Sequence, residues 1–121
     1  ISERGYRMES EVVRRDLPTV RAGGEIDLSN ADKLQHQIDQ AIGEEDNRLL
    51  LDFSDVTYID SIGIQTVLSA YREISGRQGL LAIVVKHPNI KEILEIVQIE
   101  QLPGLFVFGD VESAEKALSE S

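Results

Sequence analysis

Two continuous apolar runs, each followed by a stretch of helical spacing, limit the folds open to this sequence. The segment "NRLLLDFSD" begins at residue 47, and "LLAIVV" runs from Leu80 to Val85. Such runs are typical of β-strands that are covered on both faces, as in parallel sheets. The stretch between them places several apolar residues on one helical face: Ile64, Val67, Leu68, Tyr71 and Ile74. This order favours a right-handed βαβ crossover on a largely parallel sheet.

The segments on either side extend the pattern. Residues 8–27 alternate weakly and contain Pro18 and a Gly-Gly pair, which predicts two short strands joined by a turn at a sheet edge. "SNADKLQHQIDQAIG" predicts a helix that is capped by Ser29 and ends at Gly43. Further helices are predicted from Asn89 and after a cap at Asp110, with the short strand "GLFVF" between them.

The predicted fold is therefore a single α/β domain over residues 1–121, with its core at about 8–119. It has a mixed, mostly parallel sheet of about four to five strands and about four α-helices.

Composition excludes several classes of function. The 121 residues include 41% hydrophobic residues, enough for one core, and the net charge of −10 disfavours binding to nucleic acid or anionic lipid. There is no cysteine, so disulfides and thiol chemistry are excluded. No apolar stretch approaches the roughly 18 residues needed to span a bilayer. We expect a cytoplasmic protein that acts away from the membrane and from DNA or RNA.

The segment "TYIDSIGIQT" carries the candidate site. Ser61 is predicted at the carboxyl end of a strand and at the start of a helix, where functional sites of α/β sheets gather. Free N–H groups and the helix dipole are expected there to stabilise a phosphate on Ser61. Gly63 costs about 1 kcal/mol of helix stability relative to alanine, but allows close approach. Spacing alone favours the simpler interpretation, in which Asp60 or Ser61 is only the helix cap.

Other chemistries lack their motifs. There is no G-x-S-x-G elbow, and His36 and His87 have no acidic partner at motif spacing, so we predict neither a hydrolase nor a metal site. The segment "GLFVFGD" lacks the lysine that a receiver domain needs, and "RAGGE" is a turn rather than a phosphate-binding loop. The prediction is a protein that is not an enzyme and has no cofactor.

Three segments together resemble the STAS domain family, and within it the anti-sigma factor antagonists. They are "GEIDLSNADKLQHQI", "LLLDFSDVTYIDSIGIQTVL" and "HPNIKEILEIVQIEQLPGLFVF", and the likeness runs from about Val20 to Leu118. Its most specific part is "DSIG" at residues 60–63. The family typically has an aspartate, a serine, a small or hydroxyl residue and a glycine there, so Ile62 is a departure that implies a bulkier, more apolar rim.

The resemblance implies a role for each matching residue. Ser61 is the implied phosphoacceptor. Asp27 matches an acidic loop position beside the phosphoacceptor, and Asn30 matches a polar position at the start of the first helix. The implied partner-binding residues are Asp27, Asn30, Asp60, Ile62 and Gly63.

The implied mechanism is partner switching. With Ser61 unphosphorylated, the domain is expected to bind an anti-sigma factor that is itself a serine kinase, and so to release a sigma factor. The kinase phosphorylates Ser61, a PP2C-type phosphatase reverses the step, and the antagonist is a monomer or weak dimer. The alternative is a STAS scaffold or transporter-tail interaction domain without a phosphorylation switch; the short loop at residues 43–47 favours the free-standing regulator.

Overall fold

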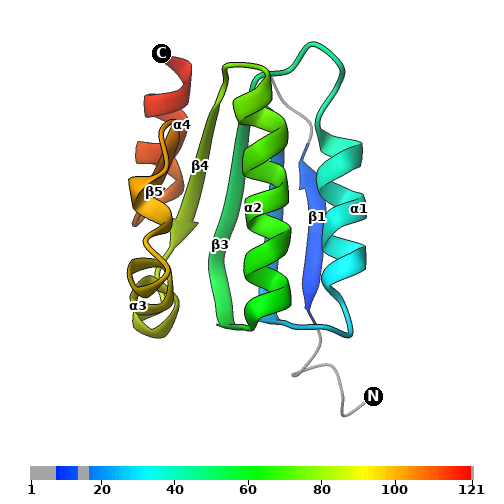
Figure 1. The fold of residues 1–121 in the computed structure, drawn as a ribbon, viewed down its shortest axis with the longest axis vertical. Helices are drawn as coiled ribbons and strands as arrows, with labels where there is room; N and C mark the ends of the chain where they lie inside the picture. Colours follow the sequence, from blue (N-terminus) through cyan, green and yellow to red (C-terminus); the bar gives the residue numbers. More distant parts are fainter. Residues whose placement is uncertain (1–7, 14–16, 121) are drawn as a thin grey trace.

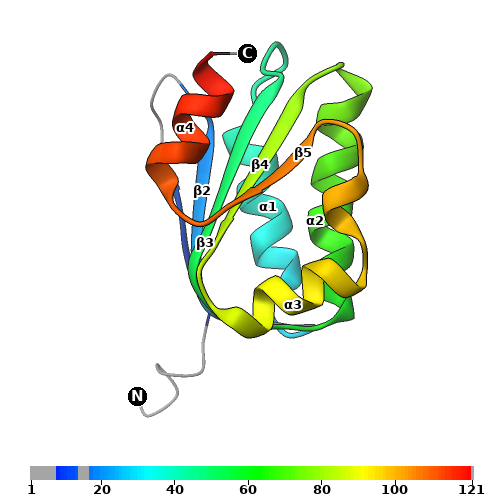
Figure 2. The same ribbon diagram turned by 90° about the vertical axis from the view of Figure 1, so that its left-hand side faces the viewer.

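The computed structural model describes residues 8–13 and 17–120, which form one sheet with helices on both faces (Figures 1 and 2). In these residues the sheet has five strands, in spatial order β1-β2-β3-β4-β5. β1 pairs antiparallel with β2, and every other neighbouring pair is parallel. This confirms the predicted mixed, mostly parallel sheet. The strands are β1 (Glu9–Val13), β2 (Thr19–Ile26), β3 (Arg48–Ile59), β4 (Leu80–Val85) and β5 (Leu105–Phe108).

Four α-helices lie in the described part of the chain, and they divide between the two faces of the sheet. They are α1 (Ala31–Ala41), α2 (Ser61–Gly76), α3 (Pro88–Ile96) and α4 (Val111–Ser119). Figure 2 shows α1 and α2 on one face and α4 on the other. Each parallel pair of neighbouring strands needs a crossover, and the helices supply these connections.

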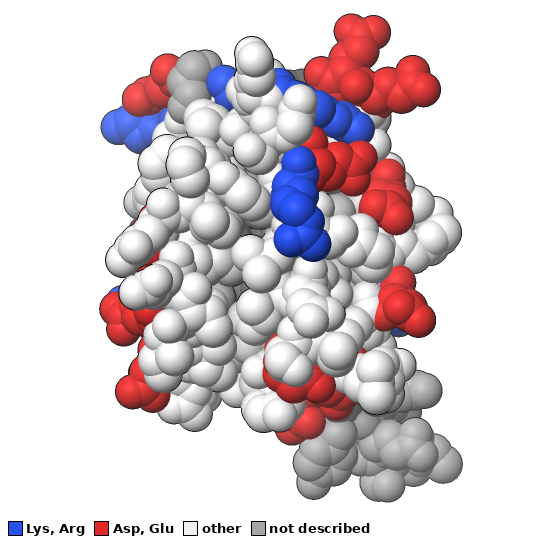
Figure 3. Space-filling view, in the orientation of Figure 1, with Lys and Arg blue, Asp and Glu red and all other residues white. Residues whose placement is uncertain are grey.

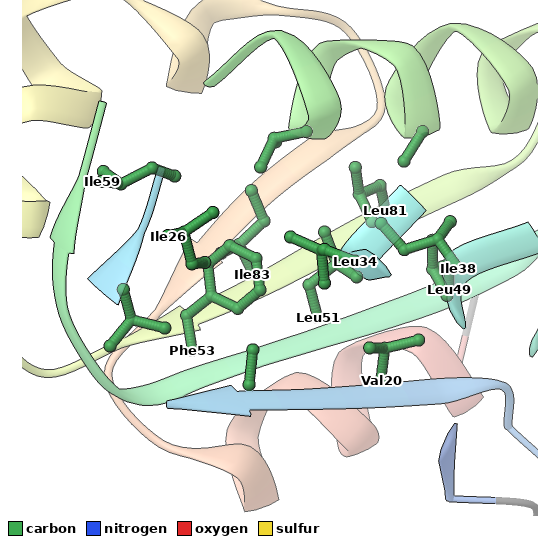
Figure 4. Packing of buried hydrophobic residues seen from close by; sticks show 14 of the residues in the cluster. Val20, Ile26, Leu34, Ile38, Leu49, Leu51, Phe53, Ile59, Leu81 and Ile83 are labelled. Carbon is green, nitrogen blue, oxygen red and sulfur yellow. The ribbon is translucent and has the colours of Figure 1, made fainter. Parts of the chain in front are cut away.

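The two apolar runs form the central strands, as predicted. The side chains of Leu49, Leu50 and Leu51 in β3 are fully buried, and so are those of Leu81 to Val84 in β4. A larger hydrophobic core fills the space between the sheet and helices α1 to α3, and a smaller one lies under α4. Figure 4 shows side chains of β2, β3 and β4 pointing into the larger core.

β3 is longer than the strand that follows it. Its pairing with β4 ends at Phe53 and Val85, whereas its pairing with β2 continues to Ile26 and Ile59. Residues 54–59 of β3 therefore extend beyond β4 and are supported on one side only, by β2. α2 begins at the end of this extension, where the sequence placed it.

Helix ends show where the sequence-based prediction was inaccurate. Ser29 was predicted to cap α1, but α1 begins at Ala31, and the cap position belongs to Asn30, whose side chain makes no capping bond. α3 begins one residue before the predicted Asn89, because Pro88 suits the first helical turn and the imidazole of His87 accepts a bond from the Asn89 amide. The predicted cap of α4 by Asp110 is confirmed, since its carboxylate accepts from the amide of Ser113.

Gly63 lets the start of α2 pack directly on the ends of two strands. A Cβ atom at this position would lie 2.6 Å from Cγ1 of Ile59 and 2.9 Å from Cγ2 of Ile26, which is closer than van der Waals contact allows. Gly63 itself is buried. The residue is therefore needed to bring the first turn of α2 against β2 and β3.

This contact gives a stability prediction. Gly63→Ala is expected to lower the free energy of unfolding by about 1–3 kcal/mol, because the added methyl group forces α2 away from Ile59 and Ile26. Gly76→Ala is the matched control in the same helix, since a Cβ there meets nothing within 4 Å. Urea denaturation of both variants tests the contact; an equal effect of the two substitutions would show that it does not constrain the helix.

Candidate functional site

Ser61 is the first residue of α2, and its side chain is exposed. The residue before it, Asp60, follows the last residue of β3, and its backbone amide donates to the carbonyl of Ile26 at 3.1 Å. This bond joins the ends of two parallel strands at the point where the helix begins. Ser61 is thus an exposed hydroxyl on a firmly supported turn at the carboxyl end of the sheet.

Asp60 caps α2 with one oxygen and holds a neighbouring loop with the other. Its Oδ1 accepts from the amides of Ile62 and Gly63, both at 3.0 Å. Its Oδ2 accepts from the amide of Leu28 at 3.2 Å. Of the two caps that the sequence left open, Asp60 is the one observed. The same carboxylate ties the turn after β2 to the start of α2.

This arrangement corrects one expectation from the sequence. Free amides in the first turn of α2 were expected to stabilise a phosphate on Ser61, but those of Ile62 and Gly63 already bind Asp60. A phosphate on Ser61 would have to compete with a carboxylate for these donors. The charge of Asp60 therefore occupies the place that was assigned to the phosphate.

The loop at residues 27–30 is fixed by its own side chains. Asp27 Oδ1 accepts from the amide of Ser29 at 2.9 Å and from its hydroxyl at 2.6 Å. Asn30 Oδ1 accepts from the Asp27 amide at 2.9 Å, and Asn30 Nδ2 donates to the carbonyl of Glu25 at 2.8 Å. Asp27 and Asn30, both predicted as partner-binding residues, therefore build the loop that lies beside Ser61. Ser29, predicted as the cap of α1, belongs to this turn instead.

The remaining predicted residues differ in accessibility. Ile62 is half-buried, next to Ser61, while Gly63 is buried under the helix start. Asp60 brings Ser61, Ile62 and the loop of Asp27 and Asn30 to one end of the molecule, and Gly63 lies beneath them. Five of the six predicted residues therefore lie at the surface of this end, and the sixth is packed against the sheet.

Sequence reasoning missed Leu28, the residue whose amide binds Asp60. Its side chain is 73% exposed, more than that of any other large hydrophobic residue in the described part of the chain. The sequence does contain a feature that could have identified it, because "DLSN" places a leucine inside an otherwise polar turn. A turn residue with no apolar neighbours is a poor candidate for the core and a good one for a surface contact.

This end of the molecule is acidic. Residues 22–32 and 54–71 contain five acidic residues and no lysine or arginine: Glu25, Asp27, Asp32, Asp55 and Asp60. Figure 3 shows a largely uncharged face over α2; acidic side chains lie at the end where α2 begins, and both acidic and basic side chains lie at the opposite end. The exposed hydroxyl therefore lies between an uncharged helix surface and a group of carboxylates.

The described residues contain neither a metal-binding cluster nor a membrane-spanning helix. No three or more histidine, aspartate or glutamate side chains come together there in a way that could hold a metal ion. Among the same residues, no helix has the length and apolar character needed to cross a bilayer.

The dual role of Asp60 gives a testable prediction. Asp60→Ala removes the cap of α2, which is expected to lower the free energy of unfolding by about 0.5–2 kcal/mol. It also releases the amide of Leu28, so hydrogen exchange at Leu28 should become faster. Asp110→Ala is the matched control, because Asp110 caps α4 and has no bond to the loop. Exchange at Leu28 measured by NMR should change in the first variant only; unchanged protection in Asp60→Ala would contradict the link.

The fold has close counterparts among known proteins. A solved anti-sigma factor antagonist from Mycobacterium paratuberculosis superposes with a TM-score of 0.82 at 20% identity, over 93% of this chain and 95% of that one. The unphosphorylated form of the anti-sigma factor antagonist SpoIIAA superposes with a TM-score of 0.75 at 20% identity, over 95% and 98% of the two chains. These likenesses establish the fold.

Sequence comparison gives the family. The anti-sigma F factor antagonist of Paenibacillus polymyxa is 26% identical over 83 residues, which is 68% of this chain and 71% of that protein. BtrV of Bordetella bronchiseptica is 27% identical over 73 residues, or 60% of this chain, and the match spans less than two thirds of its length, 63%. The sequence model of the STAS domain matches residues 9–114. The chain thus belongs to the STAS domain family, and its resemblance is to the anti-sigma factor antagonists within it.

Proposed function

We propose that this chain is an anti-sigma factor antagonist that works by partner switching, with Ser61 as the phosphorylated residue. When Ser61 carries a free hydroxyl, the domain binds an anti-sigma factor that is itself a serine kinase, and the kinase releases the sigma factor that it was holding. The proposal places this exchange in the cytoplasm. The names of the relatives support the antagonist role, since the Paenibacillus protein is an anti-sigma F factor antagonist and the Mycobacterium structure is an anti-sigma factor antagonist.

The single observation that carries the proposal is the position of Ser61. Its hydroxyl is exposed at the first residue of a helix whose start is fixed by Asp60 and by Gly63. A kinase needs an acceptor that it can reach and that stays in one place relative to the docking surface. Ser61 meets both needs, because it lies on the surface and its neighbours on either side are held by hydrogen bonds.

The chemistry requires no catalytic group from this domain. The kinase transfers the γ-phosphoryl group of ATP to Oγ of Ser61, which forms the phosphate ester and ADP and releases the hydroxyl proton. A PP2C-type phosphatase hydrolyses the ester with water, and Ser61 and inorganic phosphate are regenerated. In this proposal the domain supplies the acceptor and the docking surface only.

Phosphorylation acts through local charge. A phosphate adds about 1.5 to 2 negative charges at neutral pH. On Ser61 that charge lies next to the carboxylate of Asp60, which already binds two amides of the helix start. The added charge therefore stays on the surface, where it opposes contact with a kinase surface that fits the neutral hydroxyl.

The first test locates the phosphate. Wild type, Ser61→Ala and Ser29→Ala are incubated with ATP and a lysate of the source organism, and intact masses and fragments are then measured. Ser29 is the matched control because it is exposed at the same end of the molecule. Wild type and Ser29→Ala should each gain one phosphoryl group on Ser61, and Ser61→Ala should gain none. Absence of phosphate from wild type would overturn the proposal and favour a STAS scaffold without a switch.

The second test measures the switch itself. The kinase is purified by following the activity that phosphorylates Ser61, and its affinity for variants is measured by calorimetry. Ser61→Asp is expected to bind at least about tenfold more weakly than wild type, because a buried or crowded charge at the contact is unfavourable. Ser61→Ala should bind as wild type does. Ser75→Asp is the control, since it adds the same charge at the far end of α2; wild-type affinity of Ser61→Asp would refute the switch.

A further inference from the structure

Leu28 differs from an ordinary exposed leucine because its backbone is fixed by hydrogen bonds. Single exposed apolar residues are common and need no explanation. Here the backbone on both sides of Leu28 is fixed, by the Asp27 and Asn30 bonds within the loop and by the bond from its own amide to Asp60. A loop whose backbone is fixed before binding loses little backbone conformational entropy when a partner covers its apolar side chain.

Ile62 lies on the other side of the same carboxylate. The amide of Leu28 binds Oδ2 of Asp60, and the amide of Ile62 binds Oδ1. Because the two oxygens belong to one carboxylate, Leu28 and Ile62 flank Asp60 and lie beside Ser61. We call these two residues the Leu28–Ile62 anchor.

The surroundings of the anchor resemble an interface with an uncharged centre and a charged margin. From Ser61 to Tyr71 the sequence of α2 contains no charged residue, and Figure 3 shows the resulting uncharged face. Acidic residues follow at the end of this face, including Asp27 and Asp60. Interface centres are depleted in charge and their rims are polar, so the pattern suits protein binding.

The margin also indicates the charge of the partner. Residues 22–32 and 54–71 contain five acidic residues and no lysine or arginine, although Arg21, Lys33 and Arg72 border these ranges. On the connection between β4 and α3, Lys86 lies close enough to Asp110 to contribute to lowering the pKa of that carboxyl group, after the two bonds from Ser113. In these two segments five carboxyl groups face no lysine or arginine, so the margin suits a positively charged partner surface.

We propose that the Leu28–Ile62 anchor determines partner choice, by inserting into an apolar pocket that is edged by lysine or arginine side chains on the kinase. This inference rests on the proposed function and adds to it the chemistry of the partner surface. It also explains how a single phosphate on Ser61 prevents the domain from binding the kinase. A phosphate on Ser61 lies beside side chains that must be dehydrated in the complex, and charge resists dehydration.

The experiment uses the kinase that phosphorylates Ser61, in its purified form, as the binding probe for the full chain. Calorimetry compares wild type, Leu28→Ala and Ile62→Ser with the control Ile96→Ala, whose side chain is 71% exposed at the end of α3. Leu28→Ala and Ile62→Ser should each weaken binding by about tenfold or more, and Ile96→Ala should change it by less than about twofold. Leu28→Met keeps an apolar side chain and should restore most of the affinity. Affinity should also fall as salt is raised, because the acidic margin is screened.

The outcomes separate this inference from the proposed function. If wild type binds the kinase and Leu28→Ala binds equally well, the anchor is refuted while partner switching stands. Equal losses in Leu28→Ala and Ile96→Ala would also refute it, because the effect would then belong to exposed apolar area in general. If wild type binds no kinase and Ser61 gains no phosphate, the proposed function fails and the anchor fails with it. Circular dichroism and urea midpoints should match wild type for Leu28→Ala, since its side chain contributes little to the core.

Discussion

One carboxylate organises the candidate site. Asp60 binds the first amides of α2 with one oxygen and the amide of Leu28 with the other, so it joins two segments that are far apart in the sequence. It caps the helix that begins at Ser61 and attaches to that helix the loop at residues 27–30, which its own side chains hold in shape. Without this carboxylate, the first amides of α2 would have no partner within the helix.

The arrangement of strands places this carboxylate where a partner can reach it. β3 continues past the end of β4, so its last residues pair with β2 alone and lead to Asp60 at the end of the sheet. Gly63 then allows α2 to turn back closely against the sheet. A longer β4 or a larger residue at position 63 would bury the end of β3 or displace the helix. The exposure of Ser61 thus follows from strand length and from one close contact.

The sequence predicted the framework well because the framework depends on patterns that extend over many residues. The apolar runs around Leu50 and Ile83 and the helical spacing of residues 61–76 identify the central βαβ unit without ambiguity. Details that depend on a single hydrogen bond were harder to predict from the sequence. Ser29 and Asn30 are both good capping residues by type, and only the folded loop shows that each is used elsewhere. The capping of α2 by Asp60 is local and was among the caps that the sequence left open. The bond between Asp60 and the amide of Leu28 joins residues 32 positions apart, and no local pattern predicts that contact.

The bond between Asp60 and the loop at residues 27–30 determines at what stage of folding the site forms. Asp60 can reach Leu28 only after β2 and β3 have aligned in parallel, which is a non-local pairing and forms later than a hairpin or an isolated helix. A nascent or unfolded chain contains Ser61 in its sequence but lacks the surface around it. The site is therefore a property of the finished fold, and the kinase that we propose would recognise Ser61 only in chains whose β2 and β3 have paired.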